Sequence, residues 1–331
     1  MSKSKTTVMT LAKEIKSEAD AYAYMERLRW PDGPVCPHCG SVEKHYFLTP
    51  KTKDADNVAA RKTTRGTMTQ RRVWKCKTCR KQFSVTTGTV FHGTKVSLHT
   101  WLMVVFEMCA NKNGVAAREI ARKYGVAPKT AWFMTNRLRE AMKNRASERL
   151  ISGVVVADET YIGPTPRFQH GYKPVKGGQG TMRGDKVAVV SLVERESGEV
   201  RSRVVPNVTG ENLKRVIEEN VSMPHSILHT DSETAYLQVA HRFSQHHAVN
   251  HREREFVRGD VTTNQAENYF SQLKRSLDGT HHHVSREHLP RYLAEFDFRF
   301  STRDLDDTDR MARLIRRVGG RRLSYKPLTG Q

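Results

Sequence analysis

The chain has 331 residues, a length that suggests two or three folded domains. Lys and Arg number 56 against 35 Asp and Glu, and the formal net charge of +21 exceeds what solubility requires. The excess lies in residues 1–150, which hold 29 basic and 12 acidic side chains, whereas residues 151–331 hold 27 and 23. We therefore expect a polyanionic partner that binds mainly to the N-terminal half.

Apolar segments are short along the whole sequence. The longest runs, at 153–157 and 101–106, fall far below the roughly 18 residues that a membrane span needs. The first residues, Met-Ser-Lys-Ser-Lys, lack the apolar region of a signal peptide. We expect a folded protein that stays in the cytoplasm and has no membrane partner.

Four of the five cysteines form two Cys-x-x-Cys pairs, Cys36 with Cys39 and Cys76 with Cys79. This spacing lets both sulfurs of one tight turn reach a tetrahedral ion at about 2.3 Å, so two such turns complete a four-thiolate zinc site. The strand-like alternation after the second pair is typical of a zinc ribbon. The alternatives are free buried thiols, or His38 in place of one sulfur.

The segment between the two cysteine pairs is polar and basic, especially at 51–54 and 61–66, and has no periodicity. It predicts a long hairpin loop. Such a loop either is solvated or contacts the DNA backbone.

A helix-turn-helix pattern follows. An Ala- and Ile-rich helix leads to a turn at Gly125, and a second helix opens near Pro128 and runs to about Arg149. The small core predicted for this helix-turn-helix comprises Ile120, Ala121, Val126, Trp132 and Leu138. Its predicted outward face, near base edges and phosphates, comprises Lys129, Thr130, Phe133, Asn136 and Arg137. The alternative is a helical linker that only packs on the rest of the chain.

The second half alternates strands with helices. The apolar run that ends in Asp158 predicts a strand covered on both faces, and a second apolar strand ends in Asp231. Between them lie a glycine-rich loop at 163–184, two strands and a helix; a later helix, opening at Thr263, carries Glu267. The predicted order β-β-β-α-β-α-β-α is that of a ribonuclease H-like fold, with a mixed sheet and flanking helices.

This fold is expected to place three acidic residues at one edge of the sheet: Asp158, Asp231 and Glu267. Oxygen ligands suit Mg²⁺ or Mn²⁺, and two ions about 3.5–4 Å apart can activate the attacking oxygen and stabilise the leaving one in phosphoryl transfer. The alternative is that each acid is a cap or turn residue; Asp231, for example, precedes a predicted helix.

The sequence also resembles the bacterial insertion-sequence transposases of the ISXO-like group, from about residue 20 to 305. The motifs that carry the resemblance are Cys-Pro-His-Cys-Gly at 36–40, Asp-Glu-Thr-Tyr-Ile-Gly at 158–163, His-Thr-Asp at 229–231, Thr-Asn-x-x-Glu-x-x-Phe at 263–270, Lys274-Arg275, and the segment 288–299. The resemblance implies a DDE transposase with Asp158, Asp231 and Glu267 as metal ligands. Some relatives use Asn in the third position, so Asn268 is an alternative to Glu267.

Further basic groups follow the triad. Lys274 lies two helical turns after Glu267 and, with Arg275, either contacts a phosphate of the transposon end or is solvated. The triplet His281–His283 predicts a phosphate contact or a polar loop. The tail at 310–326 predicts another DNA-backbone contact through Arg313, Arg316, Arg317, Arg321 and Arg322.

These observations favour a transposase that binds terminal inverted repeats of double-stranded DNA, and then cleaves and joins strands as a homodimer or larger assembly. The alternatives are a non-catalytic DNA-binding regulator and a hydrolytic nuclease. We expect four parts: residues 1–95, an N-terminal helix and zinc ribbon; 96–150, the helix-turn-helix; 151–305, the catalytic domain; and 306–331, a basic tail.

Overall fold

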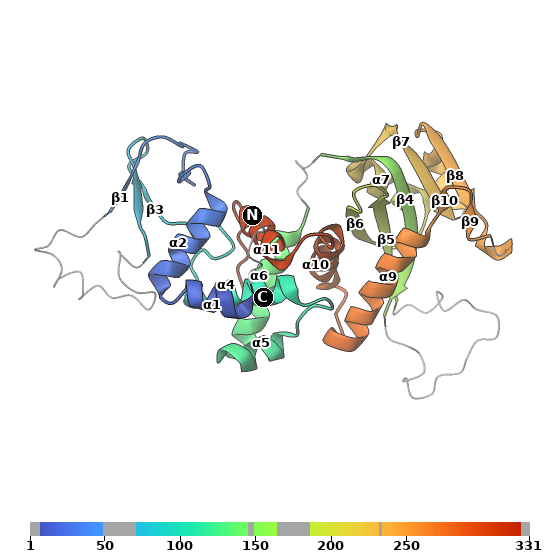
Figure 1. Ribbon diagram of the computed structural model, residues 1–331. Helices are drawn as coiled ribbons and strands as arrows, with labels where there is room; N and C mark the ends of the chain where they lie inside the picture. The colour runs from blue at the N-terminus through green and yellow to red at the C-terminus, as the bar shows by residue number, and fades with distance from the viewer. Residues whose placement is uncertain are drawn as a thin grey trace, which may run out of the picture. The chain divides into compact units, whose positions relative to one another are not determined.

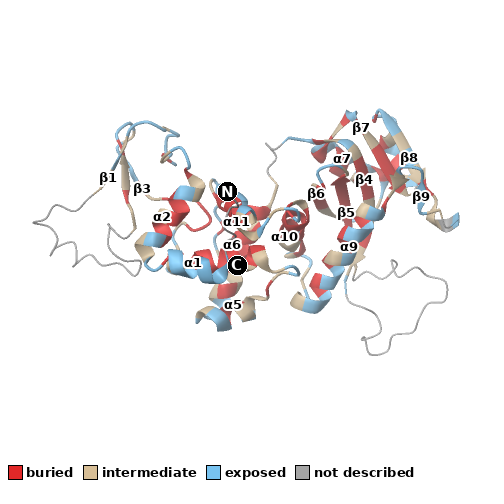
Figure 2. Cartoon of the chain, in the orientation of Figure 1, coloured by how far each residue is buried: buried red, intermediate tan, exposed pale blue. Residues whose placement is uncertain are grey.

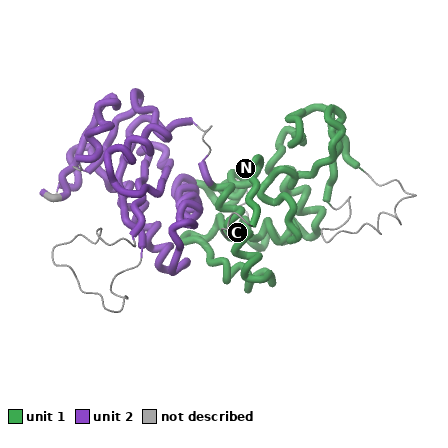
Figure 3. Tube along the Cα trace, turned by 180° about the vertical axis from the view of Figure 1, so that it is seen from behind, with its two compact units in different colours: residues 1–142, 305–331 green, residues 143–304 purple. Residues whose placement is uncertain are grey.

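In the computed structural model of the chain (Figure 1), the structure describes residues 7–48, 71–144, 149–163, 186–231, 234–253 and 255–325. They belong to two compact units, residues 1–142 with 305–331 and residues 143–304 (Figure 3). The expected four-part division is finer and stays a prediction. The predicted glycine-rich loop, after Gly163, and most of the predicted basic hairpin loop lie outside the described residues.

The first unit opens with two helices and a small sheet. Helices α1 (Val8–Glu14) and α2 (Glu18–Arg29) each begin with a capping box, in which a Thr or Ser side chain accepts from the backbone of the third helical residue. Three short antiparallel strands follow in the order β1-β2-β3: β1 (His45–Phe47), β2 (Trp74–Cys76) and β3 (Gln82–Phe83). These strands build the zinc ribbon that the cysteine spacing predicted.

Four further helices complete this unit. They are α4 (Leu98–Ala110), α5 (Ala117–Tyr124), α6 (Pro128–Met142) and α11 (Asp307–Arg317). Gly125 takes a φ of 62° and ends α5, because the left-handed region costs glycine little, and α6 begins at Pro128 as predicted. Helix α6 ends at Met142, so the expectation that it runs to about Arg149 was wrong. Residues 145–148 lie outside the described part.

The second unit is built on a five-stranded sheet in the order β6-β5-β4-β7-β8. Its strands are β4 (Ile151–Ile162), β5 (Val187–Glu194), β6 (Val200–Val205), β7 (Val221–Asp231) and β8 (Gln245–Val249). Strands β4, β5 and β6 are antiparallel, whereas β7 runs parallel to β4 and β8 parallel to β7. This mixed sheet confirms the predicted ribonuclease H-like order.

Helices cover both faces of this sheet, and its interior is buried (Figure 2). Helix α7 (Gly210–Asn220) packs with Val155 and Ala157 of β4 on one face, and α9 (Asn264–Ser276) and α10 (Leu289–Ser301) pack with Val156 on the other. Thr234–Tyr236 and α8 (Leu237–Ala240) form only short turns where one longer helix was expected. A small hairpin, β9 (Val257–Arg258) and β10 (Val261–Thr262), precedes α9.

Candidate functional sites

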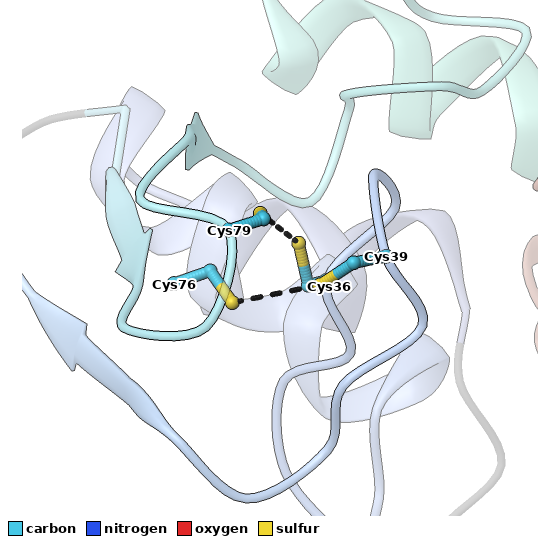
Figure 4. A group of neighbouring side chains, drawn as sticks. All are labelled: Cys36, Cys39, Cys76 and Cys79. Carbon is cyan, nitrogen blue, oxygen red and sulfur yellow. Dashed lines mark hydrogen bonds between the residues drawn. The ribbon is translucent and has the colours of Figure 1, made fainter.

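The four paired cysteines converge in the zinc ribbon (Figure 4). Their sulfur atoms all lie within 4.8 Å of one another, with 3.6 Å between the sulfurs of Cys36 and Cys79 and 3.7 Å between those of Cys39 and Cys76. A tetrahedral ion that binds sulfur at about 2.3 Å separates its ligands by about 3.8 Å. The cluster therefore has the size of a zinc site.

The chemistry of the cluster also suits a cation. Backbone amides, first of all that of Cys79, lower the pKa of the Cys76 thiol to about 6, and the thiolate is the form that binds metal. His38 does not belong to the group, since its ring nitrogen Nε2 lies 3.3 Å from the carbonyl oxygen of Gln82. Cys109 is buried in α4, as an ordinary apolar thiol would be.

Two of the predicted carboxylates lie on neighbouring parallel strands. Val156 of β4 is in register with His229 of β7, and Asp158 and Asp231 each lie two residues further along. Because residues two apart on a strand share a face, both aspartates belong to the face that α9 covers. Asp158 lies within β4, which continues to Ile162, so the expectation that the strand ends at this residue was wrong.

Glu267 completes the acidic group from the first turn of α9. Burial, and after it the negative charges of Glu159, Asp231 and Glu267, together raise the pKa of Asp158 to about 8. These neighbours disfavour the ionised form, and a bound cation would reverse their effect. The oxygen donor set is the one that Mg²⁺ and Mn²⁺ prefer, so the residues fit such ions.

The acidic group is more open than the cysteine cluster. Among the described residues, the four cysteines form the only group of three or more metal-ligand side chains whose ligand atoms all lie within 4.8 Å. Asn268, the alternative third ligand, accepts a 3.1 Å hydrogen bond from Gln272 one turn along α9. Glu267 instead acts electrostatically on Asp158.

Two residues beside Glu267 had no predicted role. The Thr263 hydroxyl donates to Oε1 of Glu267 at 3.1 Å, and Nε2 of His251 lies 3.2 Å from the same hydroxyl. Thr263 was part of the motif at 263–270, but a motif does not show where a hydroxyl points. His251 begins a short 3-10 helix, His251–Glu253, that follows β8, and no motif named it.

The predicted DNA-facing side chains of α6 fall into two groups. Lys129 is exposed, with its ammonium 4.6 Å from the ring centre of Tyr325, while Thr130 and Phe133 are half-buried. Asn136 and Arg137 are buried, so their expected place on the outward face was wrong. Arg137 donates to the carbonyl oxygen of His92 at 2.6 Å, and Asn136 to that of Trp132 at 2.9 Å.

Other predicted basic groups are also divided between surface and interior. Lys274 and Arg275 are exposed on α9. His281 packs edge-on against Tyr292, with 4.8 Å between ring centres, whereas the other two histidines of the triplet are exposed.

The C-terminal arginines show the same division. In the tail, Arg310 donates to the carbonyl of Cys109 and Arg321 to that of Glu140, whereas Arg313 and Arg322 are exposed. Residues after Tyr325 lie outside the described part.

These features define a multidomain α/β protein in which a zinc ribbon accompanies a ribonuclease H-like domain. Residues 150–301 match the family described as the ISXO2-like transposase domain, and residues 16–82 match the transposase zinc-ribbon domain. The chain therefore combines an ISXO2-like transposase domain with a transposase zinc-ribbon domain.

A relative from Halobacterium salinarum, described as an uncharacterized protein in transposable element ISH50, is 27% identical over 295 residues, which are 87% of this chain and 92% of the relative. None of the described helices is long and apolar enough to cross a membrane.

Proposed function

We propose that the chain is an active transposase, which binds the terminal inverted repeats of its insertion sequence and catalyses strand cleavage and strand transfer. The observation that supports this proposal is geometric: Asp158 and Asp231 lie on one face of the neighbouring strands β4 and β7, and that face packs against α9, the helix that carries Glu267. Acting on chromosomal DNA, such an enzyme works in the cytoplasm, on the nucleoid.

Asp158, Asp231 and Glu267 would hold the catalytic Mg²⁺ or Mn²⁺ in this proposal. When bound, the metal activates an attacking oxygen and neutralises charge on the leaving oxygen. The side chains of the triad bind the cation and orient it against the phosphate. The chain needs no nucleophile of its own, because water attacks in cleavage and the freed 3′-hydroxyl of the DNA attacks in transfer.

DNA binding is assigned to the first unit and to α9. The ribbon and the α5–α6 pair supply the main contacts, with exposed Lys129 and half-buried Thr130 towards the DNA. Exposed Lys274 and Arg275 would hold phosphates near the triad. Because both ends of an element must be brought together, we propose a homodimer or larger assembly.

The test is an assay of the zinc-loaded full chain on labelled end DNA with Mg²⁺. Asp158→Asn, Asp231→Asn and Glu267→Gln should each abolish nicking and joining while DNA binding persists. Glu218→Gln, which changes an acid of α7 paired with Arg242, is the matched control and should leave both products. Binding without nicking by the unsubstituted chain would favour the regulator, and nicking without joining the nuclease.

A further inference from the structure

Thr263 occupies the N-cap position of α9, the helix that carries Glu267, yet its side chain makes no capping hydrogen bond. Threonine at this position ordinarily accepts from a backbone N–H of the first helical turn. Here the hydroxyl donates instead to Oε1 of Glu267, four residues along the helix. The side chain therefore serves the carboxylate rather than the helix end.

The direction of these hydrogen bonds follows from the number of protons available. A threonine hydroxyl can donate only one hydrogen bond, and the Thr263 hydroxyl donates it to Glu267. The 3.2 Å contact between this hydroxyl and Nε2 of His251 then requires the imidazole to donate. The chain of donors runs from His251 through Thr263 to Glu267.

Burial makes this arrangement rigid in the middle and leaves it partly exposed at both ends. Thr263 is fully buried, whereas the side chains of His251 and Glu267 are 30% and 47% exposed. The His251 ring packs against Phe256, with 5.3 Å between ring centres, which limits its rotation. Within the described part of the chain, both polar contacts of Glu267 engage Oε1, so Oε2 remains for a ligand.

We propose that Thr263 and His251 are positioning residues, which hold Glu267 in the rotamer that binds the catalytic metal ion. This inference rests on the proposed function, because it takes Glu267 as a metal ligand. A flexible glutamate on a half-exposed helix face loses side-chain entropy when it binds an ion, and a buried hydroxyl that fixes it beforehand reduces this loss. Partners of metal ligands typically contribute 10–100-fold in metal affinity.

The test measures Mn²⁺ binding to the zinc-loaded full chain without DNA, by the electron paramagnetic resonance signal of free Mn²⁺. Thr263→Val keeps the shape but removes the hydroxyl, and should weaken Mn²⁺ binding about 10-fold or more. Thr263→Ser keeps the hydroxyl and should bind within about threefold of the unsubstituted chain. His251→Phe keeps the ring against Phe256, removes the donor, and should weaken binding by a smaller factor.

Two reference variants separate the possible outcomes. Thr209→Val changes the N-cap threonine of α7, which also makes no capping hydrogen bond, and should leave Mn²⁺ affinity unchanged. Glu267→Gln should weaken binding at least as much as Thr263→Val. Should Glu267→Gln bind Mn²⁺ as the unsubstituted chain does, both the ligand assignment and this inference are overturned.

A different result overturns the inference alone. That result is weaker binding by Glu267→Gln together with unchanged binding by Thr263→Val. If Thr263→Val does not fold, equal binding by His251→Phe and the unsubstituted chain overturns the donor chain.

Discussion

The Tyr269 hydroxyl of α9 donates a 2.7 Å hydrogen bond to Oδ1 of Asp297 in α10, and both residues are buried. Oδ2 of Asp297 accepts from the backbone N–H of Ser202 in β6 at 2.8 Å. Asp297 therefore joins both helices to the sheet, and its partner Tyr269 lies two residues along α9 from Glu267. Buried polar groups with several partners fix one packing arrangement, and here they fix the helix that carries the third carboxylate.

The first prediction concerns the pH dependence of stability. Burial raises the pKa of Asp297 from 3.8 to about 6. Between these pH values the folded chain retains a proton that the unfolded chain has lost, so the contribution of Asp297 to the free energy of unfolding is greatest below pH 4 and falls as pH rises to 6. The fall amounts to about 3 kcal/mol at most.

Asp297→Asn should remove this fall, because the neutral amide does not titrate, and its NH₂ group can donate to the Tyr269 hydroxyl. All four tryptophans lie in the first unit, so their fluorescence does not report on this one. Hydrogen exchange of the β5 and β6 amides between pH 4 and 7 is the suitable measurement. The same pH dependence in the variant and the unsubstituted chain would contradict the prediction.

A second prediction separates a structural from a DNA-binding cation on α6. Arg137→Ala should lower the free energy of unfolding of the first unit by about 1–3 kcal/mol, because it removes a buried side chain and its hydrogen bond to the His92 carbonyl. Lys129→Ala should change stability by less than about 0.5 kcal/mol, because the ammonium is exposed. Urea unfolding followed by tryptophan fluorescence measures both.

DNA titration should rank the Lys129→Ala and Arg137→Ala variants in the opposite order, since Lys129→Ala should have the larger effect on DNA affinity. Lys129→Ala should weaken binding to the inverted repeat by about 1–3 kcal/mol if the side chain reads a base, with a smaller effect on random DNA. An equal loss of affinity for repeat and random DNA would show that Lys129 contacts phosphates and does not read a base. A stable Arg137→Ala protein with selectively lost repeat binding would contradict the structural role of Arg137.

The strands of the second unit and helix α6 of the first show which features a sequence predicts and which it does not. The strand order was predictable, as was the location of Asp158 and Asp231 on apolar strands, because β-branched apolar runs favour strands covered on both faces. The continuation of β4 past Asp158 to Ile162 was not. The burial of Asn136 and Arg137 was not, since α6 packs against α4, α5 and also α11, which returns from residues 307–317. Likewise, the Thr263–Glu267 contact depends on side-chain rotamers, which a motif does not specify.

A third prediction concerns the ribbon. Cys76→Ser should reduce zinc below one ion per chain and loosen the ribbon, because metal binding supplies much of the folding energy of such small modules. Cys109→Ala is the matched control, since this thiol is buried in α4 and lies outside the cluster. Elemental analysis of both proteins decides the matter, and undiminished zinc in Cys76→Ser would exclude the four-thiolate site.

The last prediction distinguishes Glu267 from its neighbour as the third ligand. Glu267→Ala should abolish cleavage and weaken Mn²⁺ binding, because it removes the carboxylate proposed as the third metal ligand. Asn268→Ala should retain both, since its amide oxygen is engaged by Gln272 one turn along the helix. Gln272→Ala is the matched control, because it breaks that same hydrogen bond while leaving both candidate ligand side chains unchanged. Cleavage that persists in Glu267→Ala but is lost in Asn268→Ala, with Gln272→Ala unaffected, would move the third ligand by one residue.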